Sequence, residues 1–599
     1  MTVAREEPEL RLAADFPEVT RDAWREAALA VLRKSGVDPG APHEVEEALS
    51  HTTYDGVTLR PLYDASDAEP DASGVPGHPP YVRGGRLLGG WEVRQRHAVA
   101  DPAAVAADLA GGVTSIWLVA GEGGIPVAEL PAMLAGIDLA VTPVVLDAGA
   151  QTREAAGILL AAGATKGNLG ADPLGLAART GGAPDLAVAA DLARRCADGP
   201  LRAVTVDATP YHDAGGSDAE ELGCSIATGI AYLRALTDAG LSLERAFGHL
   251  EFRYAATADQ FLTIAKLRAA RLMWARVAEE CEAAPTPQRQ HAVTSAAMMT
   301  ARDPWVNMLR TTVACFAAGV GGADAVTVRP FDACLGLPDD FARRIARNTQ
   351  SLLLMEAHVG RVADPAGGSW YVERLTRDLA EAAWAWLQEI ERAGGMTAAL
   401  ASGLVADRIA ATWDRRSANI ARRRDPIIGV SEFPNLQETL PERPPAPPAP
   451  GGGLPVVRYA QEFERLRDIA DARAERPVVF LATIGPLAEH NARASFAANL
   501  FGAGGIAAVP GGADTDPAAI AEAFRRSGAR VACLCSSDRL YGEHAAAVAA
   551  ALREAGAVRV WLAGRGEYDG VDGNVYAGCD ALAVLRTTLT DTDPGEAQA

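Results

Sequence analysis

Short apolar, β-prone runs alternate with longer helical patterns along this 599-residue chain, and this alternation limits the possible folds more than any other feature. Eight such runs lie before residue 330, the first preceded by Leu87-Leu88 and the fourth being the weakest: Trp91–Arg94, Ser115–Val119, Thr142–Leu146, Thr165–Leu169, Ala203–Val206, His249–Phe252, His291–Thr294 and Ala325–Val328. Strands that alternate with helices indicate parallel pairing with right-handed crossovers. Eight such units predict a closed (β/α)8 TIM barrel.

A second alternating region follows residue 475. Its five apolar runs are Val478–Ala482, Ile506–Val509, Val531–Cys535, Val558–Leu562 and Asn574–Ala577. Five parallel strands with helices on both faces predict a flavodoxin-like, doubly wound sheet, which binds ligands beyond the C-terminal ends of its strands. Cys533 and Cys535 would share one face of a strand, and we interpret them as buried core residues rather than metal ligands.

The proline-rich stretch from Pro434 to Pro455 separates the two regions, because it can sustain neither a helix nor a central strand. We predict four parts: an N-terminal helix and extended arm (1–80), a barrel with trailing helices (81–425), a linker (426–475) and the flavodoxin-like domain (476–599). In the arm, Arg21 to Lys34 reads as an amphipathic helix, with Trp24, Ala28, Leu29, Val31 and Leu32 on one side. An arm without its own core must pack on the barrel or on another chain.

Composition excludes several classes of function. The net charge of −21 argues against a nucleic-acid partner, because a phosphate backbone would be repelled. No uncharged apolar run reaches the roughly 18 residues that a membrane span needs, and Met1 to Pro8 lacks the pattern of a signal peptide. The eight cysteines are scattered and indicate no disulfide framework. We therefore expect a cytoplasmic protein that does not bind membranes.

Candidate chemistry in a barrel of this kind lies just after the C-terminal ends of the strands. The sequence has no G-x-x-x-x-G-K-[ST] phosphate loop, no G-x-S-x-G elbow and no H-E-x-x-H or C-x-x-C metal pattern, and Gly121–Gly124 alone is a weak phosphate signal. The candidates are Tyr211 and His212 after the fifth strand, Arg253 after the sixth as an anion contact or a surface ion pair, and Arg289, His291 and Ser295 at the seventh as a phosphate or carboxylate site. For His212, the sequence leaves two roles open, proton transfer and a structural role in the loop.

Several of these segments carry a resemblance to a known family. The chain resembles the methylmalonyl-CoA mutases in the segments Tyr211–Gly215, Phe261–Ala275, Arg344–Thr349, Asp364–Ser369 and Gly394–Met396, and in the order of barrel, linker and flavodoxin-like domain. The resemblance implies interconversion of methylmalonyl-CoA and succinyl-CoA through radicals. It also implies adenosylcobalamin held between barrel and C-terminal domain, with coenzyme A threaded along the barrel axis. Some members pair a large, cofactor-binding subunit with a similar, shorter small subunit.

The cobalamin motif of the family is incomplete in this chain. Cofactor-binding members carry D-x-H-x-x-G after the first strand of the C-terminal domain, where the His binds cobalt and the Asp orients its ring. Here His490 is present, but Ala488 stands at the Asp position and Arg493 at the Gly position. A bulky cation thus replaces the residue that must be small for the corrin to approach. We expect no cobalamin and no metal on this chain.

Other family motifs are altered as well. Ser536–Asp538 replaces an S-x-L motif, Gly564-Arg565 replaces paired glycines, and Arg96 replaces a tyrosine that packs against substrate in catalytic members. His212, with its neighbour Tyr211, matches a substrate-facing histidine, and Glu356 is placed by the resemblance at a carboxylate that contacts the cofactor ribose. We interpret these three as vestigial and predict no catalytic residue in this chain.

The sequence therefore predicts a small, non-catalytic subunit of a heterodimeric methylmalonyl-CoA mutase, a pseudoenzyme of propionate metabolism. The large catalytic subunit is its expected partner, and adenosylcobalamin is expected on that partner alone. Two alternatives remain open. The chain could be a catalytic acyl-CoA mutase with His490 as a displaced cobalt ligand, or a regulatory subunit that binds acyl-CoA. The sequence leaves undecided whether any coenzyme A channel stays open.

Overall fold

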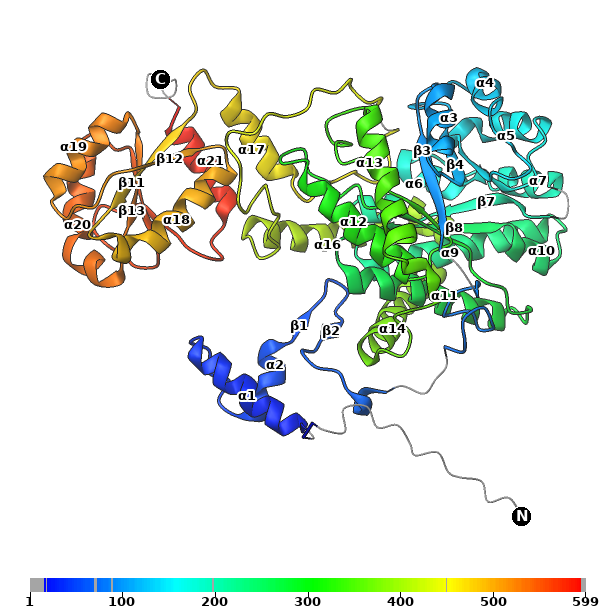
Figure 1. The fold of residues 1–599 in the computed structure, drawn as a ribbon, viewed down its shortest axis with the longest axis horizontal. Coiled ribbons are helices and arrows are strands. Elements are labelled where there is room, and N and C mark those ends of the chain that lie inside the picture. The colour runs from blue at the N-terminus through cyan, green and yellow to red at the C-terminus, as the bar shows by residue number, and fades with distance from the viewer. Residues whose placement is uncertain are drawn as a thin grey trace, which may run out of the picture.

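A computed structural model describes residues 16–17, 19–68, 73–87, 90–196, 199–448 and 450–593. Leu88, the N-terminal residues 1–15 and Ala449 of the proline-rich stretch lie outside this range, as do the features predicted on them. A barrel and a separate parallel sheet make up most of the molecule, and an N-terminal arm stands to one side (Figure 1). No helix of the described ranges is both long enough and apolar enough to cross a membrane.

Eight parallel strands close into a barrel in the order β10-β3-β4-β5-β6-β7-β8-β9, which confirms the predicted (β/α)8 architecture. They are β3 (Glu92–His97), β4 (Ser115–Val119), β5 (Val144–Asp147), β6 (Gly167–Ala171), β7 (Leu201–Asp207), β8 (Leu250–Ala256), β9 (Gln290–Thr294) and β10 (Ala325–Thr327). The weak fourth run is a strand, although it contains two glycines. At Gly167 and Gly170 a β-carbon would lie 2.0 Å from the carbonyl oxygens of Val144 and Leu146, so only glycine allows this close approach to β5.

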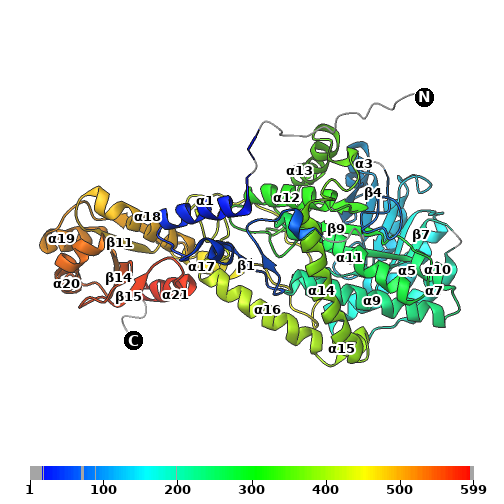
Figure 2. The same cartoon turned by 90° about the horizontal axis from the view of Figure 1, so that it is seen from below.

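Helices surround the barrel and bury its outer face. They are α3 (Pro102–Ala110), α4 (Leu130–Leu134), α5 (Thr152–Ala161), α6 (Pro173–Thr180), α7 (Ala187–Arg195), α8 (Thr209–Asp213), α9 (Asp218–Asp238), α10 (Leu243–Gly248), α11 (Gln260–Glu280), α12 (Val306–Val320) and α13 (Asp340–Ser351). Three more follow: α14 (Trp370–Arg392), α15 (Met396–Ala401) and α16 (Leu404–Ala421). Helix α16 runs from the barrel toward the C-terminal sheet (Figure 2).

The C-terminal sheet has the strand order β12-β11-β13-β14-β15, all parallel, which is the predicted flavodoxin-like topology. Its strands are β11 (Val478–Thr483), β12 (Ala507–Pro510), β13 (Val531–Cys535), β14 (Arg559–Ala563) and β15 (Gly573–Val575). Helices α18 (Leu487–Ala503) and α21 (Ala581–Asp591) cover one face, and α19 (Pro517–Ser527) and α20 (Asp538–Glu554) the other. Cys533 and Cys535 are buried together on the α18 face.

The proline-rich stretch forms neither helix nor strand over residues 433–448 and 450–458, and it is tied to the C-terminal side of the barrel. Leu337 N–H donates to the Pro444 carbonyl (2.8 Å) and Leu454 N–H to the Ala178 carbonyl (2.7 Å). Val457 N–H donates to the Asp213 carbonyl (2.8 Å). These bonds connect it to segments that follow β10, β6 and β7, and helix α17 (Gln461–Asp471) then leads to the sheet.

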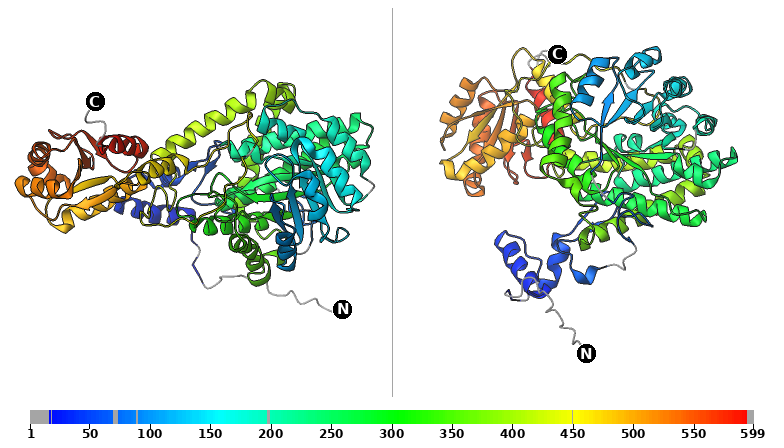
Figure 3. Two further views of the ribbon diagram at one scale, coloured as in Figure 1. Left: turned by 90° about the horizontal axis from the view of Figure 1, so that it is seen from above. Right: turned by 45° about the vertical axis from the view of Figure 1, so that its right-hand side comes forward.

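The arm contains α1 (Arg21–Lys34), α2 (Val45–Leu49) and a short hairpin of β1 (His51–Thr52) and β2 (Thr58–Leu59). The hairpin is docked on the body, because Asp55 accepts from Ala219 N–H (3.0 Å) and Arg415 donates to the Tyr54 carbonyl (3.1 Å). Helix α1 has its predicted bounds but stands away from the barrel and the sheet (Figure 3). Of its predicted apolar side only Leu29 is buried, and Val31 is 65% exposed.

Candidate functional site

Tyr211 and His212 lie on α8, directly after β7, at the C-terminal mouth of the barrel. Asp207 at the end of β7 fixes the start of this helix by accepting from Thr209 N–H (3.0 Å). Gly215 closes the turn with φ +101°, where a β-carbon would collide with the Trp413 ring. The structure therefore places both residues at the barrel mouth, as the sequence predicts.

His212 is held as a neutral hydrogen-bond acceptor. Its Nε2 lies 2.6 Å from Ser295 Oγ, which also accepts from Met298 N–H (3.2 Å). We assign the Ser295 hydroxyl as the donor and Nε2 as the acceptor, which leaves the ring proton of His212 on Nδ1. Glu221 Oε2 is 3.9 Å from Nδ1, too far for a hydrogen bond, and is bound instead by Lys266 Nζ (2.7 Å). Burial, reinforced by the charge of Lys266, lowers the pKa of His212 to about 3.

The depressed pKa of His212 makes stability depend on pH. Unfolding restores a pKa near 6.5, so the stability due to neutral burial is present above that value and lost as the pH falls. We expect His212 alone to cost about 2 kcal/mol between pH 7.5 and pH 5, from roughly 1.4 kcal/mol per pH unit. In urea unfolding, His212→Asn should flatten this dependence. The exposed His43 is the matched control, and an equal change in His43→Asn would contradict the assignment.

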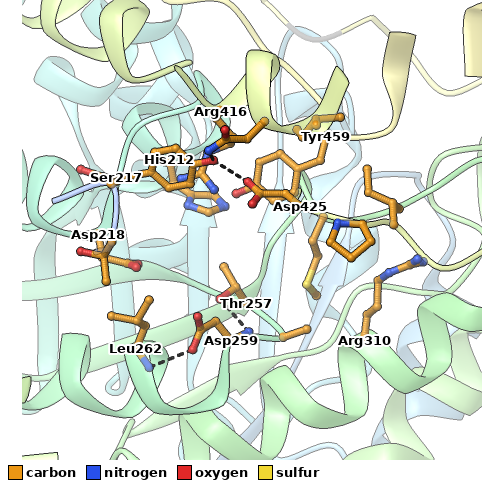
Figure 4. Close-up of a pocket in the computed structure, with 18 of the residues that line it drawn as sticks. His212, Ser217, Asp218, Thr257, Asp259, Leu262, Arg310, Arg416, Asp425 and Tyr459 are labelled. Carbon is orange, nitrogen blue, oxygen red and sulfur yellow. Dashed lines mark hydrogen bonds between the residues drawn. The ribbon is translucent and has the colours of Figure 1, made fainter. Parts of the chain in front are cut away.

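A cavity of about 750 Å³ opens beside His212 (Figure 4). Its wall combines the arm hairpin, the loops after β7 and β8, helices α12 and α16, and Tyr459. The Arg416 guanidinium lies between the rings of Tyr54 (4.2 Å) and Tyr459 (5.0 Å), and its Nε is buried without a hydrogen-bond partner among the described residues. Tyr54 hydroxyl donates to Asp425, which fastens the arm to the rim. The lining residues come from the mouth and the arm, and they include none of the arginines inside the barrel.

Ion pairs fill the N-terminal end of the barrel interior. Arg94 is bound by Glu251 and by Glu92 (3.0 Å), and Arg289 is bound by Glu92 and by Glu251 (3.2 Å). Burial alone would raise the pKa of Glu251, but the two guanidiniums outweigh it and hold that pKa well below its usual range. Arg289 is thus bound at the opposite end of β9 from Ser295. The predicted phosphate site of Arg289, His291 and Ser295 is not formed.

Arg253 fills the middle of the barrel, which corrects its predicted position after a strand. Strand β8 extends to Ala256 and carries Arg253 inside, where it is 2% exposed. Its Nη1 donates to Asp207 (2.9 Å) and Asp147 (3.3 Å), and its guanidinium lies 4.0 Å from the centre of the Trp117 ring. His291 lies beside it and bonds Thr327 through Nε2 (2.8 Å). Arg253 therefore forms a buried ion pair, not a surface one.

Arg96 lies above this layer, at the mouth. Its guanidinium is 5.5 Å from the centre of the Trp117 ring, and no described residue offers it a carboxylate within 4.0 Å. The walls of the mouth desolvate it and Arg329 repels it, and together these effects lower its pKa to about 10, although part of the side chain remains open to solvent.

Glu356 lies at the opposite end of the barrel from His212, which corrects its placement by the resemblance. It is exposed on the π-helical turn Leu352–Glu356 that continues α13. Leu354 of this turn packs against Gly90, which precedes β3, and Gly90 N–H donates to the Gly360 carbonyl (2.9 Å). Since parallel strands all start at the same end of a barrel, Glu356 and His212 belong to different ends and form no joint site.

The altered motifs of the C-terminal sheet meet at one point. Ala488, His490 and Arg493 lie in the first two turns of α18. Arg493 Nη1 donates to the Ser536 carbonyl (2.6 Å), and Nη2 donates to Asp538 (2.6 Å). A β-carbon on Gly564 would be 3.1 Å from the Arg493 Cζ atom. One guanidinium thus connects the ends of β11, β13 and β14, and it fills the crevice at the topological switch point, where a ligand of this fold would lie.

His490 points into protein rather than into a ligand cradle. It is 8% exposed, its Nδ1 is buried without a hydrogen-bond partner among the residues that the structure describes, and burial lowers its pKa. No carboxylate among the described residues orients the ring, since Ala488 stands two residues before it, at the position of the Asp in the family motif. The residues at this crevice therefore do not fit a corrin: a cation occupies the space, and the histidine lacks the acceptor that fixes its tautomer. In the described part of the chain, no three or more His, Cys, Asp or Glu side chains are grouped to hold a metal ion.

Sequence reasoning missed several residues at the mouth. Lys266 pairs with Asp218 (2.8 Å) and Glu221, fully buried beneath His212. A lysine within the apolar helix Phe261–Ala275 of a chain that has almost no lysine was a usable signal for it. Arg416 and Arg329 carried no such signal, because arginine is the usual basic residue of this sequence.

Comparisons with known proteins show which proteins this chain is similar to. A family model described as methylmalonyl-CoA mutase matches residues 182–474. The methylmalonyl-CoA mutase small subunit of Streptomyces virginiae is 60% identical over 97% of this chain and 98% of the relative. The small subunit of Propionibacterium freudenreichii subsp. shermanii is 39% identical over 97% and 96%. A methylmalonyl-CoA mutase of Cereibacter sphaeroides is 38% identical over only 42% of this chain and 36% of that protein.

Proposed function

The chain belongs to the methylmalonyl-CoA mutase family, and from this premise we propose that it is the non-catalytic small subunit of a two-subunit mutase. In this proposal the large subunit carries adenosylcobalamin and interconverts methylmalonyl-CoA and succinyl-CoA. The present chain supports the fold of that partner. The cofactor supplies radical chemistry in the family, and no step of it is assigned to a residue of this chain.

The observation that carries the proposal is the position of Arg493. Its side chain occupies the crevice of the C-terminal sheet and is held there by Ser536 and Asp538 (2.6 Å each). Seating a corrin would require this guanidinium to leave both bonds and the face of Tyr541, 5.1 Å away. Removing the charge-assisted bond to the buried Ser536 carbonyl costs about 1.5–3 kcal/mol, and the pair with the exposed Asp538 adds at most about 1 kcal/mol, before any contact with the cofactor forms.

The interior of the barrel supports the same proposal. A coenzyme A chain threaded along the axis would meet the Arg94–Glu251 layer first and the Arg253–Asp207 layer next. Both arginines are buried and paired, so an entering chain would have to separate buried ion pairs. This argues against the two alternatives that need an acyl-CoA bound along the barrel axis of this chain.

The arm supports a role in assembly. Apolar side chains on and around α1 face solvent: Phe16 (75%), Val19 (78%), Val31 (65%) and Val37 (49%). Exposed apolar residues that gather on one projecting element indicate an interface. We propose that this arm packs on the large subunit. The four-part division made from the sequence and the cytoplasmic location remain predictions.

The test is to purify the chain alone and together with a large subunit, and to measure mass and bound cobalt. We expect no cobalt on the chain alone and one cobalamin per pair, with turnover only in the pair. His490→Gln in this chain should leave both the cobalt content and the turnover of the pair unchanged. Loss of cobalt in that variant, or stoichiometric cobalamin on the chain alone, would favour a catalytic subunit with His490 as ligand.

A further inference from the structure

Two arginines meet at the same level of the barrel mouth. Strand β10 pairs with β3 in the register Ala325↔Glu92 and Val326↔Val93, so continuing this register places Arg329 beside Arg96. Neighbouring strands are about 4.8 Å apart. Side chains alternate along a strand, and Arg329 therefore faces the same way as Thr327, whose hydroxyl bonds His291 inside the barrel (2.8 Å). Trp117 of β4 lies at the same level, because it is the register partner of Arg96.

Hydrogen-bond donors collect here without acceptors. In the described ranges Arg96 makes no hydrogen bond. Arg329 donates only its backbone N–H and Nε, to Thr294 (2.8 and 3.0 Å), and keeps both terminal nitrogens free. The indole nitrogen of Trp117, 5% exposed, is buried without an acceptor. A buried donor in a folded protein nearly always has a partner, so the indole nitrogen of Trp117 points to a missing acceptor. The guanidinium nitrogens of Arg96 and Arg329, which are not buried, can bind a ligand that only accepts.

The carboxylates around the mouth compensate the charge of this pair only in part, through Asp147 near Arg96 and Asp213 near Arg329. Asp207 is bound by Arg253 (2.9 Å) and Arg179 (3.0 Å), and Asp147 by Arg253 (3.3 Å). In the described part of the chain no ion pair within 4.0 Å joins Asp213 to Arg329; burial raises the pKa of Asp213 to about 6, and the charge of Arg329 opposes that rise. Two like charges that are close together and partly desolvated repel each other, and this is unfavourable unless a counter-charge joins them.

We propose that the barrel mouth is a binding site for a small dianionic oxyanion, inorganic phosphate or a short dicarboxylate, held between the guanidiniums of Arg96 and Arg329. A guanidinium binds such oxygens in pairs, so two of them fit an anion with at least two charged oxygens. The site is entered from the C-terminal mouth, where Arg96 is open to solvent. It does not require an axial channel, and it stands whether or not the proposed subunit role holds.

The experiment is ligand-induced stabilisation and calorimetry on the purified full chain. Phosphate and succinate are compared with chloride at equal ionic strength and pH. We expect phosphate, succinate or both to raise the unfolding temperature beyond chloride, because a ligand that binds only the folded state stabilises it. A response to phosphate alone or to succinate alone supports the site and identifies the source of the anion. No response beyond that to chloride overturns it.

Substitutions decide whether the two arginines are responsible. Arg96→Gln should weaken the affinity for the stabilising anion by about 10- to 100-fold, as expected for lost hydrogen bonds to a charged group. Without anion, the same variant should be at least as stable as the parent chain, because it removes repulsion. Arg276→Gln, at an exposed arginine on α11, is the matched control. Equal anion affinity in Arg96→Gln and the parent chain would contradict the proposal.

Discussion

Glu251→Ala is expected to lower the free energy of unfolding by about 3–5 kcal/mol, the usual cost of removing one partner from a buried ion pair. Glu251 is 2% exposed and binds both Arg94 and Arg289 inside the barrel. Without it Arg94, which is fully buried, retains only Glu92 (3.0 Å) as an acidic partner among the described residues. The measurement is chemical unfolding followed by circular dichroism.

Two variants make that result specific. Glu251→Gln keeps the shape of the side chain and removes its charge, so its loss should be smaller than that of Glu251→Ala. Glu279→Ala removes a carboxylate from an exposed pair with Arg276 and should leave the free energy of unfolding essentially unchanged. Equal losses at Glu251 and Glu279 would show that the barrel network does not hold the strands together.

Val31→Asp is expected to weaken binding to the large subunit by about 10- to 100-fold while leaving the isolated chain folded. The side chain is 65% exposed, so a polar residue costs the free chain little. If the arm packs on the partner, the substitution removes the burial of a valine and places a carboxylate in an apolar contact, a loss of about 2 kcal/mol or more. The dissociation constant is measured by titration with purified large subunit.

Val141 provides a matched control for this prediction. It is 66% exposed, like Val31, but lies between α4 and β5 on the barrel. Val141→Asp should leave the dissociation constant unchanged. If both substitutions weaken binding equally, or neither does, the arm is not the contact that we propose.

The elements of this chain could be predicted because they depend on local pattern. The bounds of α1 and β4 agree with the sequence prediction residue for residue, and all thirteen predicted strands are present. Periodicity and turn residues act over a few positions, so they leave their mark in the sequence. The burial of α1 could not be predicted in this way. An amphipathic helix predicts that another element covers its apolar side, but it does not identify that element.

The candidate residues were located less well, because strand ends and pairings depend on the closed barrel. Arg253 was placed after a strand, but closure extends β8 to Ala256 and turns Arg253 inward. Glu356 was placed by the family resemblance, and the π-helical turn carries it to the other end of the barrel. The roles of Lys266 and Arg329 depend on residues distant in sequence that the fold brings close to them.

The sequence by itself determined the fold class, the order of the two strand-and-helix regions, and the loss of small and acidic residues at Arg493 and Ala488. Tertiary structure alone decided that Arg493 reaches Ser536 and Asp538, that buried ion pairs fill the barrel axis, and that Arg329 comes close enough to Arg96 to repel it. The physical reason is range. Backbone pattern is set by neighbours along the chain, whereas the electrostatics of a buried group is set by whichever charges the fold brings within a few ångströms.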